Sequence, residues 1–163
     1  MCDKKEHQRK IIVSACFGSL LLALYFLIFS FSEQDGEQSG NLSALISAKC
    51  VEILNALTGR NWTQAMMTNM AAYFENPLRK LAHFAEYTLM GMLVYGMWSP
   101  WIHKGKKRNV LVVFWVFVSA ATDEFHQLFV PGRCGSVMDV LLDTCGGIFG
   151  VVFLILLGKI RKV

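Results

Sequence analysis

Charged residues and prolines are both scarce in this chain of 163 residues. Asp, Glu, Lys and Arg make up 17% of the sequence, hydrophobic residues make up 54%, and there are three prolines. From Ile11 to Phe31 there is no charged residue at all. The apolar residues are not spread evenly along the chain, as they would be in a protein with a soluble core. With only three prolines to interrupt the chain, we expect one domain, residues 1–163.

Two other features are missing. The five cysteines lack the paired spacing of a metal site. No small-x-small cleavage motif precedes Glu33, and the apolar run before it is too long for a signal peptide. We therefore expect the first apolar run to remain in the protein as a membrane span.

Apolar residues gather in four blocks, 11–31, 77–100, 109–129 and 137–158. Each block is long enough to cross a bilayer as a helix, and the last three carry ionisable residues near one end only. We predict an all-α integral membrane protein with four transmembrane helices. Its single domain then consists of an N-terminal span within 1–31, an outer segment at 32–76 and a three-span core at 77–158.

Basic residues give the predicted orientation. If the spans alternate, eleven of the sixteen Lys and Arg residues fall on one side: Lys4, Lys5, Arg9, Lys10, Lys104, Lys106, Lys107, Arg108, Lys159, Arg161 and Lys162. The positive-inside rule makes that side the cytoplasm. We therefore expect a multi-pass protein of the cell membrane, with both termini cytoplasmic and residues 32–76 and 130–136 outside. Because the basic residues lie at span ends, the net charge of +4 does not indicate a nucleic-acid partner.

The outer segment is expected to contain a flexible linker at 33–40 and two short helices in the membrane interface. Apolar residues at helical spacing end at Gly59, a typical C-cap, and a second amphipathic run follows from Trp62. These helices either cover a site as a lid or pack on the spans, and packing is the favoured alternative. Asn76 and Pro77 are expected to begin the second span. Cys50 and Cys134 would both lie outside, and free thiols are favoured over a bridge between them.

Ionisable residues of three predicted spans should lie at one depth, about 8–10 Å below the outer surface at 1.5 Å per residue. This layer contains His83, Glu86, Asp123, Glu124, Asp139 and Asp143. An ionisable side chain inside a bilayer costs about 2.5–3.5 kcal/mol on insertion scales, so such residues are kept where they pair or act. The layer is therefore a candidate functional site.

Helical spacing also places these residues on shared faces. The groups are Lys80, His83 and Tyr87; Asp123, Glu124 and Gln127; and Asp139 with Asp143. Ser136 to Asp139 fits a capping box, which leaves a structural and a functional role for Asp139 equally open. For Glu124 and Asp143 a functional role is favoured over a structural one. The alternative for His126 is that it only ends a helix, and for Arg133 that its side chain extends to the membrane surface.

Three motifs lie in the second, third and fourth predicted spans: RKLAHFAEYTLMG, TDEFHQLFVPGR and GSVMDVLLDTCGGIFG. Together they resemble the VanZ-like family of small bacterial membrane proteins, named for a teicoplanin-resistance protein, over roughly residues 77–151. The matching positions are Lys80, His83, Tyr87, Asp123, Glu124, His126, Gln127, Pro131, Arg133, Asp139, Asp143 and Gly147.

The resemblance implies reduced sensitivity to a lipoglycopeptide, without a defined reaction. In one interpretation the site is an enzyme centre open to the outer leaflet, acting on a lipid-linked or cell-envelope substrate. The catalytic candidates are then Glu124 as general acid or base, with His83, Asp143 and Asp123. The substrate-binding candidates are Lys80 and Arg133 for a phosphate or carboxylate, with Gln127, His126, Tyr87 and Asp139.

In the other interpretation the site binds a lipid head group, or excludes the antibiotic, without turnover. The expected partners are membrane lipids, together with a lipid-linked cell-wall precursor or the lipoglycopeptide itself. No cofactor is assigned. A metal site is a minor alternative. Residues of suitable types are present, but no His-x-x-x-His type signature connects them. These residues are His83, Glu86, Asp123, His126 and Asp143.

Overall fold

The computed structural model describes residues 2–103 and 105–160, and within these ranges all regular structure is α-helical. The helices are α1 (Cys2–Ser32), α2 (Gly36–Thr58), α3 (Gln64–Trp98), α4 (Gly105–Gln127) and α5 (Val137–Ile160). The predicted all-α class is confirmed. Three of the basic residues used for the orientation, Lys104, Arg161 and Lys162, lie outside the described ranges.

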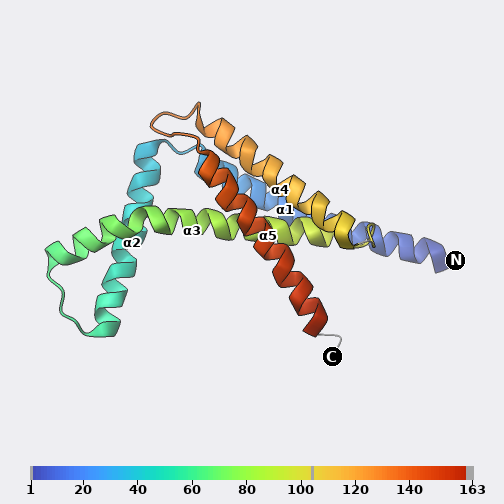
Figure 1. The fold of residues 1–163 in the computed structure, drawn as a ribbon, viewed down its shortest axis with the longest axis horizontal. Helices are drawn as coiled ribbons and strands as arrows, with labels where there is room; N and C mark the ends of the chain where they lie inside the picture. The colour runs from blue at the N-terminus through green and yellow to red at the C-terminus, as the bar shows by residue number, and fades with distance from the viewer. Residues whose placement is uncertain (1, 104, 161–163) are drawn as a thin grey trace.

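Helix α3 is the centre of the fold and packs against each of the other described helices (Figure 1). The buried apolar residues recur every three or four positions along α1, α3 and α4, so each of these helices turns one stripe inward. This core consists of Leu21, Leu24, Ile28, Tyr87, Met90, Leu93, Val94, Val112, Val116, Ala120 and Val151.

Glycines allow α3 and α5 to cross at close range (Figure 1). A Cβ atom added at Gly91 would overlap the carbonyl oxygen of Gly147, and one added at Gly146 would lie 2.6 Å from the carbonyl oxygen of Phe84. The hydroxyl of Thr88 donates a 3.0 Å hydrogen bond across the crossing to the carbonyl oxygen of Gly146. Small residues have the same effect in membrane helix pairs.

The outer segment differs from its prediction. Residues 36–40, predicted as flexible linker, form the first turns of α2, because the amide of Gly36 is held by the carbonyl oxygen of Pro131 at 3.0 Å. The predicted second short helix is the first half of α3, which continues through Pro77 instead of beginning there. Its N-cap is Thr63, whose side chain accepts a 3.3 Å hydrogen bond from the amide of Met66. Proline removes one helix hydrogen bond, but packing on α2 supports the turns around it.

Helix α2 and the first half of α3 form a hairpin that extends away from the other helices (Figure 1). The chain turns at Gly59 and Asn61, whose φ angles are 63° and 50°. The side-chain oxygen of Asn55 accepts a 3.0 Å hydrogen bond from the amide of Trp62, which ties the turn back to α2. The predicted helix end at Gly59 is confirmed, and the two short interfacial helices are replaced by this hairpin.

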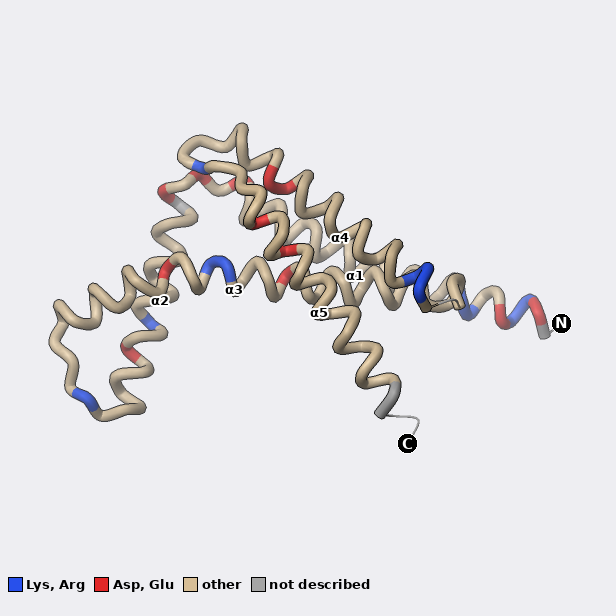
Figure 2. Tube along the Cα trace, in the orientation of Figure 1, with Lys and Arg blue, Asp and Glu red and all other residues tan. Residues whose placement is uncertain are grey.

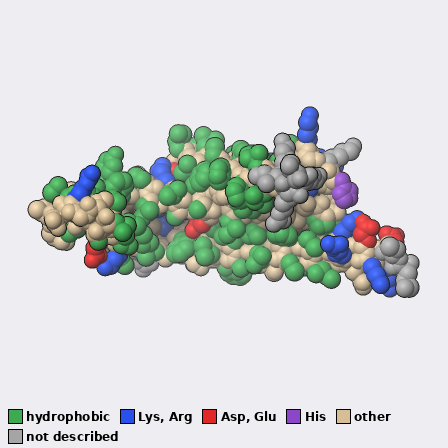
Figure 3. Space-filling model, turned by 90° about the horizontal axis from the view of Figure 1, so that it is seen from below, with side chains coloured by type: hydrophobic (Ala, Val, Ile, Leu, Met, Phe, Trp, Pro, Cys, Tyr) green, Lys and Arg blue, Asp and Glu red, His purple; other side chains and the backbone are tan. Residues whose placement is uncertain are grey.

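Within the described ranges, two helical segments are long and apolar enough to cross a membrane, Asp3–Ser32 and Val137–Gly158. The other two predicted spans, in α3 and α4, stay predictions because their polar residues lower the hydropathy. Hydrophobic side chains cover much of the long face seen in Figure 3, and charged ones gather toward its ends. Such a surface is compatible with a membrane protein.

The basic residues of the first turns of α1 and of the start of α4 lie at the same end of the molecule (Figure 2). Contacts near these residues hold that end together: the ring of His7 packs edge-on against Trp101 with centroids 5.7 Å apart, and the Trp101 indole donates a 2.7 Å hydrogen bond to Ser14. The α4–α5 loop lies at the opposite end of α4.

Candidate functional site

The loop 128–136 between α4 and α5 is fastened to the join between α1 and α2. Arg133 donates from Nε to the carbonyl oxygen of Gln34 at 3.0 Å and from an Nη to that of Phe31 at 2.8 Å. Gly132 has a φ of 72°, and a Cβ at Gly36 would overlap its carbonyl group. The guanidinium of Arg133 is therefore anchored to backbone carbonyls rather than extended freely to the surface.

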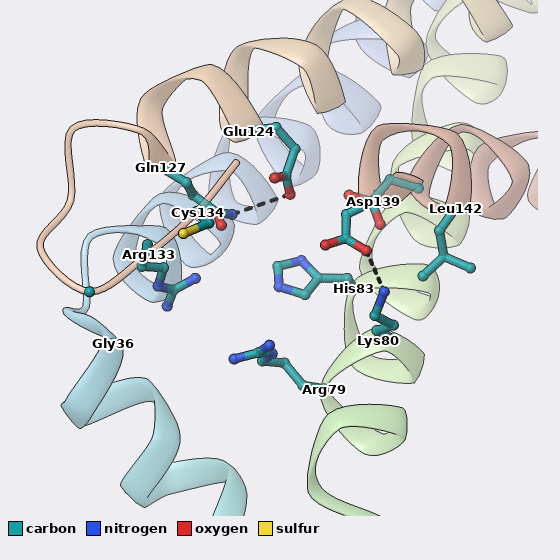
Figure 4. A pocket seen from close by; sticks show the side chains of 12 residues that line it. Gly36, Arg79, Lys80, His83, Glu124, Gln127, Arg133, Cys134, Asp139 and Leu142 are labelled. Carbon is teal, nitrogen blue, oxygen red and sulfur yellow. Dashed lines mark hydrogen bonds and ion pairs between the residues drawn. The ribbon is translucent and has the colours of Figure 1, made fainter. Parts of the chain in front are cut away.

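A cavity of about 260 Å³ lies beneath this loop, and we call it the polar cavity (Figure 4). Side chains from α3, α4, the loop and α5 meet in it. Its lining consists of Gly36, Arg79, Lys80, His83, Glu124, Gln127, Gly132, Arg133, Cys134, Asp139, Leu142 and Asp143. Seven of the ten candidate site residues are brought together here: Lys80, His83, Glu124, Gln127, Arg133, Asp139 and Asp143.

Glu124 is 7% exposed, and its carboxylate meets the start of α5. Oxygen Oε2 accepts a 2.8 Å hydrogen bond from the backbone N–H of Ser136, and Oε1 lies 3.5 Å from the amide nitrogen of Gln127. Ser136 directly precedes α5, so the acid lies at a helix N-terminus, where negative charge is favoured.

Asp139 belongs to an ion pair and not to a capping box. Its Oδ1 lies 2.7 Å from Nζ of Lys80, and the amide of Ser136, which a capping box would use, is bonded to Glu124 instead. The capping-box alternative is therefore wrong. The two side chains are 44% and 32% exposed, so the pair contributes no more than about 1 kcal/mol.

Asp143 lines the same cavity and is 1% exposed. Neither of its carboxylate oxygens has a hydrogen-bond partner among the described residues. A buried carboxylate is disfavoured as an anion unless a proton, a water molecule or a bound group meets its oxygens. The neighbouring His83 is mostly buried, and its Nδ1 has no hydrogen bond but lies 3.7 Å from Oε2 of Glu86.

Three candidate site residues lie outside the polar cavity. Asp123 and Tyr87, 4% and 1% exposed, line a separate hollow between α1, α3 and α4. The ring of His126 packs against Phe29 of α1, with centroids 5.3 Å apart. Asp123 is connected to the cavity only indirectly, because Gln127 lies 3.3 Å from its Oδ2 and also reaches Glu124.

Sequence reasoning missed two polar members of the lining, Arg79 and Cys134. Arg79 precedes His83 by four residues, so helical spacing would have placed it on the same face. Its guanidinium points toward the cavity, opposite that of Arg133 (Figure 4). The thiols of Cys134 and Cys50 are free, in agreement with the prediction.

The structure does not bring the proposed metal ligands together. Among the described residues there is no group of three or more His, Cys, Asp and Glu side chains arranged to hold a metal ion. The polar cavity instead combines cationic side chains with acids, an arrangement suited to holding an anionic group beside a proton donor or acceptor.

Comparison with known proteins gives one family. A family profile described as VanZ/LLP1 matches residues 17–158, which include all of the polar cavity. No curated protein matches the chain, and no solved structure does.

Proposed function

This chain belongs to the VanZ/LLP1 family, and from that premise we propose that it is a cell-envelope membrane protein whose polar cavity acts on a lipid-linked or envelope substrate. The observation that carries this proposal is Asp143, whose two carboxylate oxygens are buried without a hydrogen-bond partner among the described residues, in the wall of a cavity that is also lined by cations. Groups with perturbed environments of this kind are concentrated at functional sites.

The proposed chemistry is acid–base catalysis beside an anchored anion. Glu124 is held by the N-terminus of α5 and serves as the ionised partner, while Asp143 carries the proton. Two carboxyl groups in different surroundings can divide the roles of base and acid in this way. Lys80 and Arg133 place a phosphate or carboxylate of the substrate against them.

The proposed topology keeps four spans, with both ends in the cytoplasm and the polar cavity on the extracytoplasmic side. Its support is the separation in Figure 2 between the basic end of the molecule and the loop above the cavity. A site on that side fits the phenotype after which the family is named, reduced sensitivity to teicoplanin, since such antibiotics act outside the membrane.

A second candidate function is binding without turnover, of a lipid head group or of the antibiotic. It is favoured by the contacts that join separate helices across the cavity. Lys80 of α3 pairs with Asp139 of α5, and Arg133 bonds backbone carbonyls at the end of α1. In that case the charged groups hold the site together and no proton is transferred.

The test uses neutral isosteres of the two acids. Glu124→Gln and Asp143→Asn should abolish the teicoplanin or other envelope phenotype while the variants still insert and melt normally. Glu52→Gln, which changes an exposed acid on the hairpin, is the matched control and should keep the phenotype. If both cavity variants keep the phenotype, the enzyme proposal fails; if they lose it with unchanged ligand binding, the binding alternative fails.

A further inference from the structure

A second, largely apolar hollow of about 360 Å³ adjoins the polar cavity; we call it the apolar groove. It lies between the end of α1, the first half of α2 and the middle of α3. Its apolar lining includes Leu42, Ile46, Leu78, Leu81, Ala82 and Ala85. The two spaces share three residues, Arg79, His83 and Arg133, so they meet at a cationic junction.

Two of the three residues at the junction are arginines, and the third, His83, lies 3.7 Å from Glu86, an acid that also lines the apolar groove. The ion pairs of the described residues include neither Arg79 nor Arg133. Arg79 donates a long 3.4 Å hydrogen bond to Asn76, and the hydrogen bonds of Arg133 go to backbone carbonyls. Burial lowers the pKa of the Arg133 guanidinium, and the positive charge of Arg79 lowers it further, whereas the nearby carboxylates of Asp123, Glu124 and Asp35 raise it. Two guanidinium groups that repel each other are stabilised by an anion placed between them.

The apolar groove is also open to the hydrophobic outer surface. Leu42 is 37% exposed, Ile46 is 45% exposed and Leu81 is 61% exposed. A water-soluble anion would use the arginines and leave these side chains without a partner. An amphiphile would satisfy both spaces at once, because its head group meets the arginines and its tail covers the apolar side chains.

We propose that the occupant is an anionic membrane lipid, with its phosphate between Arg79 and Arg133 and one acyl chain in the apolar groove. The head group then faces Glu124 and Asp143 in the polar cavity. This inference rests on the function proposed above and specifies its substrate class. It replaces Lys80, which is paired with Asp139, by Arg79 as the partner of Arg133 in phosphate binding. It also assigns Ala82 and Ala85 to the wall against which the chain lies.

Cys134 provides a reporter, because its free thiol lines the polar cavity. A variant with Cys134 as its single cysteine is placed in nanodiscs of phosphatidylcholine, with or without phosphatidylglycerol, and labelled with a neutral maleimide. Phosphatidylglycerol should slow labelling about tenfold, since a site filled at about nine times its Kd leaves about one-tenth of the molecules open. A matched variant with only Cys50, on the hairpin and outside both spaces, should label at the same rate in both lipids.

Two substitutions separate the head-group and chain contacts. Arg79→Gln removes one guanidinium, and Ala82→Trp fills the apolar groove; each should abolish the protection by phosphatidylglycerol. Arg60→Gln and Ala65→Trp make the same changes on exposed parts of the hairpin and should keep it. Full protection in the Arg79 and Ala82 variants would overturn the inference, as would equal protection of the wild type by inorganic phosphate in phosphatidylcholine alone.

The lipid inference and the proposed function can fail separately. Glu124→Gln leaves both guanidinium groups in place, so phosphatidylglycerol should still protect Cys134 while the envelope phenotype is lost. Loss of the phenotype without any protection of wild-type Cys134 would overturn the lipid inference alone. Protection together with a retained phenotype in Glu124→Gln and Asp143→Asn would overturn the enzymatic proposal and keep the lipid site.

Discussion

The backbone N–H of Ser136 donates a 2.8 Å hydrogen bond to Oε2 of Glu124, so the acid of one helix meets the amide end of the next. A hydrogen bond to a charged group contributes about 1.5–3 kcal/mol, which offsets part of the cost of burying this carboxylate. Asp143, two turns into α5, receives no such bond from the part of the chain that the structure describes. The two acids therefore differ in what stabilises them, and that difference is the basis of the roles proposed for them.

The first prediction concerns the stability of the Asp143 site. Asp143→Asn should leave the free energy of unfolding unchanged, or raise it by about 1 kcal/mol, because it removes an ionisable group whose oxygens have no partner. Denaturant unfolding of the purified protein in detergent measures the change. A loss of more than about 2 kcal/mol would assign the carboxylate a structural role instead.

The second prediction concerns the α3–α5 crossing. Gly91→Ala should destabilise the protein by about 1–3 kcal/mol, because the added methyl group would overlap the backbone of Gly147. Gly158→Ala is the matched control, since nothing lies within 4 Å of a Cβ added there, and it should be neutral or slightly stabilising. Equal melting temperatures for the two variants would mean that the close approach at Gly91 is not a feature of the protein.

The third prediction concerns the ion pair across the polar cavity. A double-mutant cycle of Lys80→Gln and Asp139→Asn should give a coupling energy of no more than about 1 kcal/mol, because both side chains are partly exposed. Chemical unfolding of the single and double variants supplies the four values. A coupling energy above about 2 kcal/mol would indicate that lipid shields the pair from water, contrary to its exposure in this structure.

The fourth prediction concerns orientation. Cys134 should react with an impermeant thiol reagent added to intact cells, whereas a cysteine substituted at His103 should react only after the membrane is opened. The expectation follows from the basic residues of α1 and of the start of α4 at the end opposite the polar cavity. Labelling of His103→Cys in intact cells, with Cys134 protected, would reverse the proposed orientation.

Much of the site could be predicted from the rise and the number of residues per turn of an α-helix. Depth and face placed His83, Glu124 and Asp143 together because a helix has a fixed rise and a fixed turn per residue, and all three line one cavity. The same arithmetic could not show that Asp123 and Tyr87 line a different hollow, because residues at one depth can still face different neighbours.

The outer segment was harder to predict for physical reasons. A proline after Asn76 is typical of a helix start, but here residues of α2 lie beside Phe74, Pro77 and Leu78, and the helix continues. Residues 36–40 are polar and contain two glycines, which resembles a linker, but the amide of Gly36 is hydrogen-bonded to the distant Pro131. Long-range contacts of this kind leave no local pattern in a sequence.

The fastening between the α1–α2 join and the α4–α5 loop has a mechanical consequence. The amide of Gly36 is hydrogen-bonded to Pro131, and Arg133 is hydrogen-bonded to Phe31 and Gln34, so three hydrogen bonds join the base of the α2 hairpin to one wall of the polar cavity. A displacement of the hairpin base would therefore strain the two hydrogen bonds that position the Arg133 guanidinium.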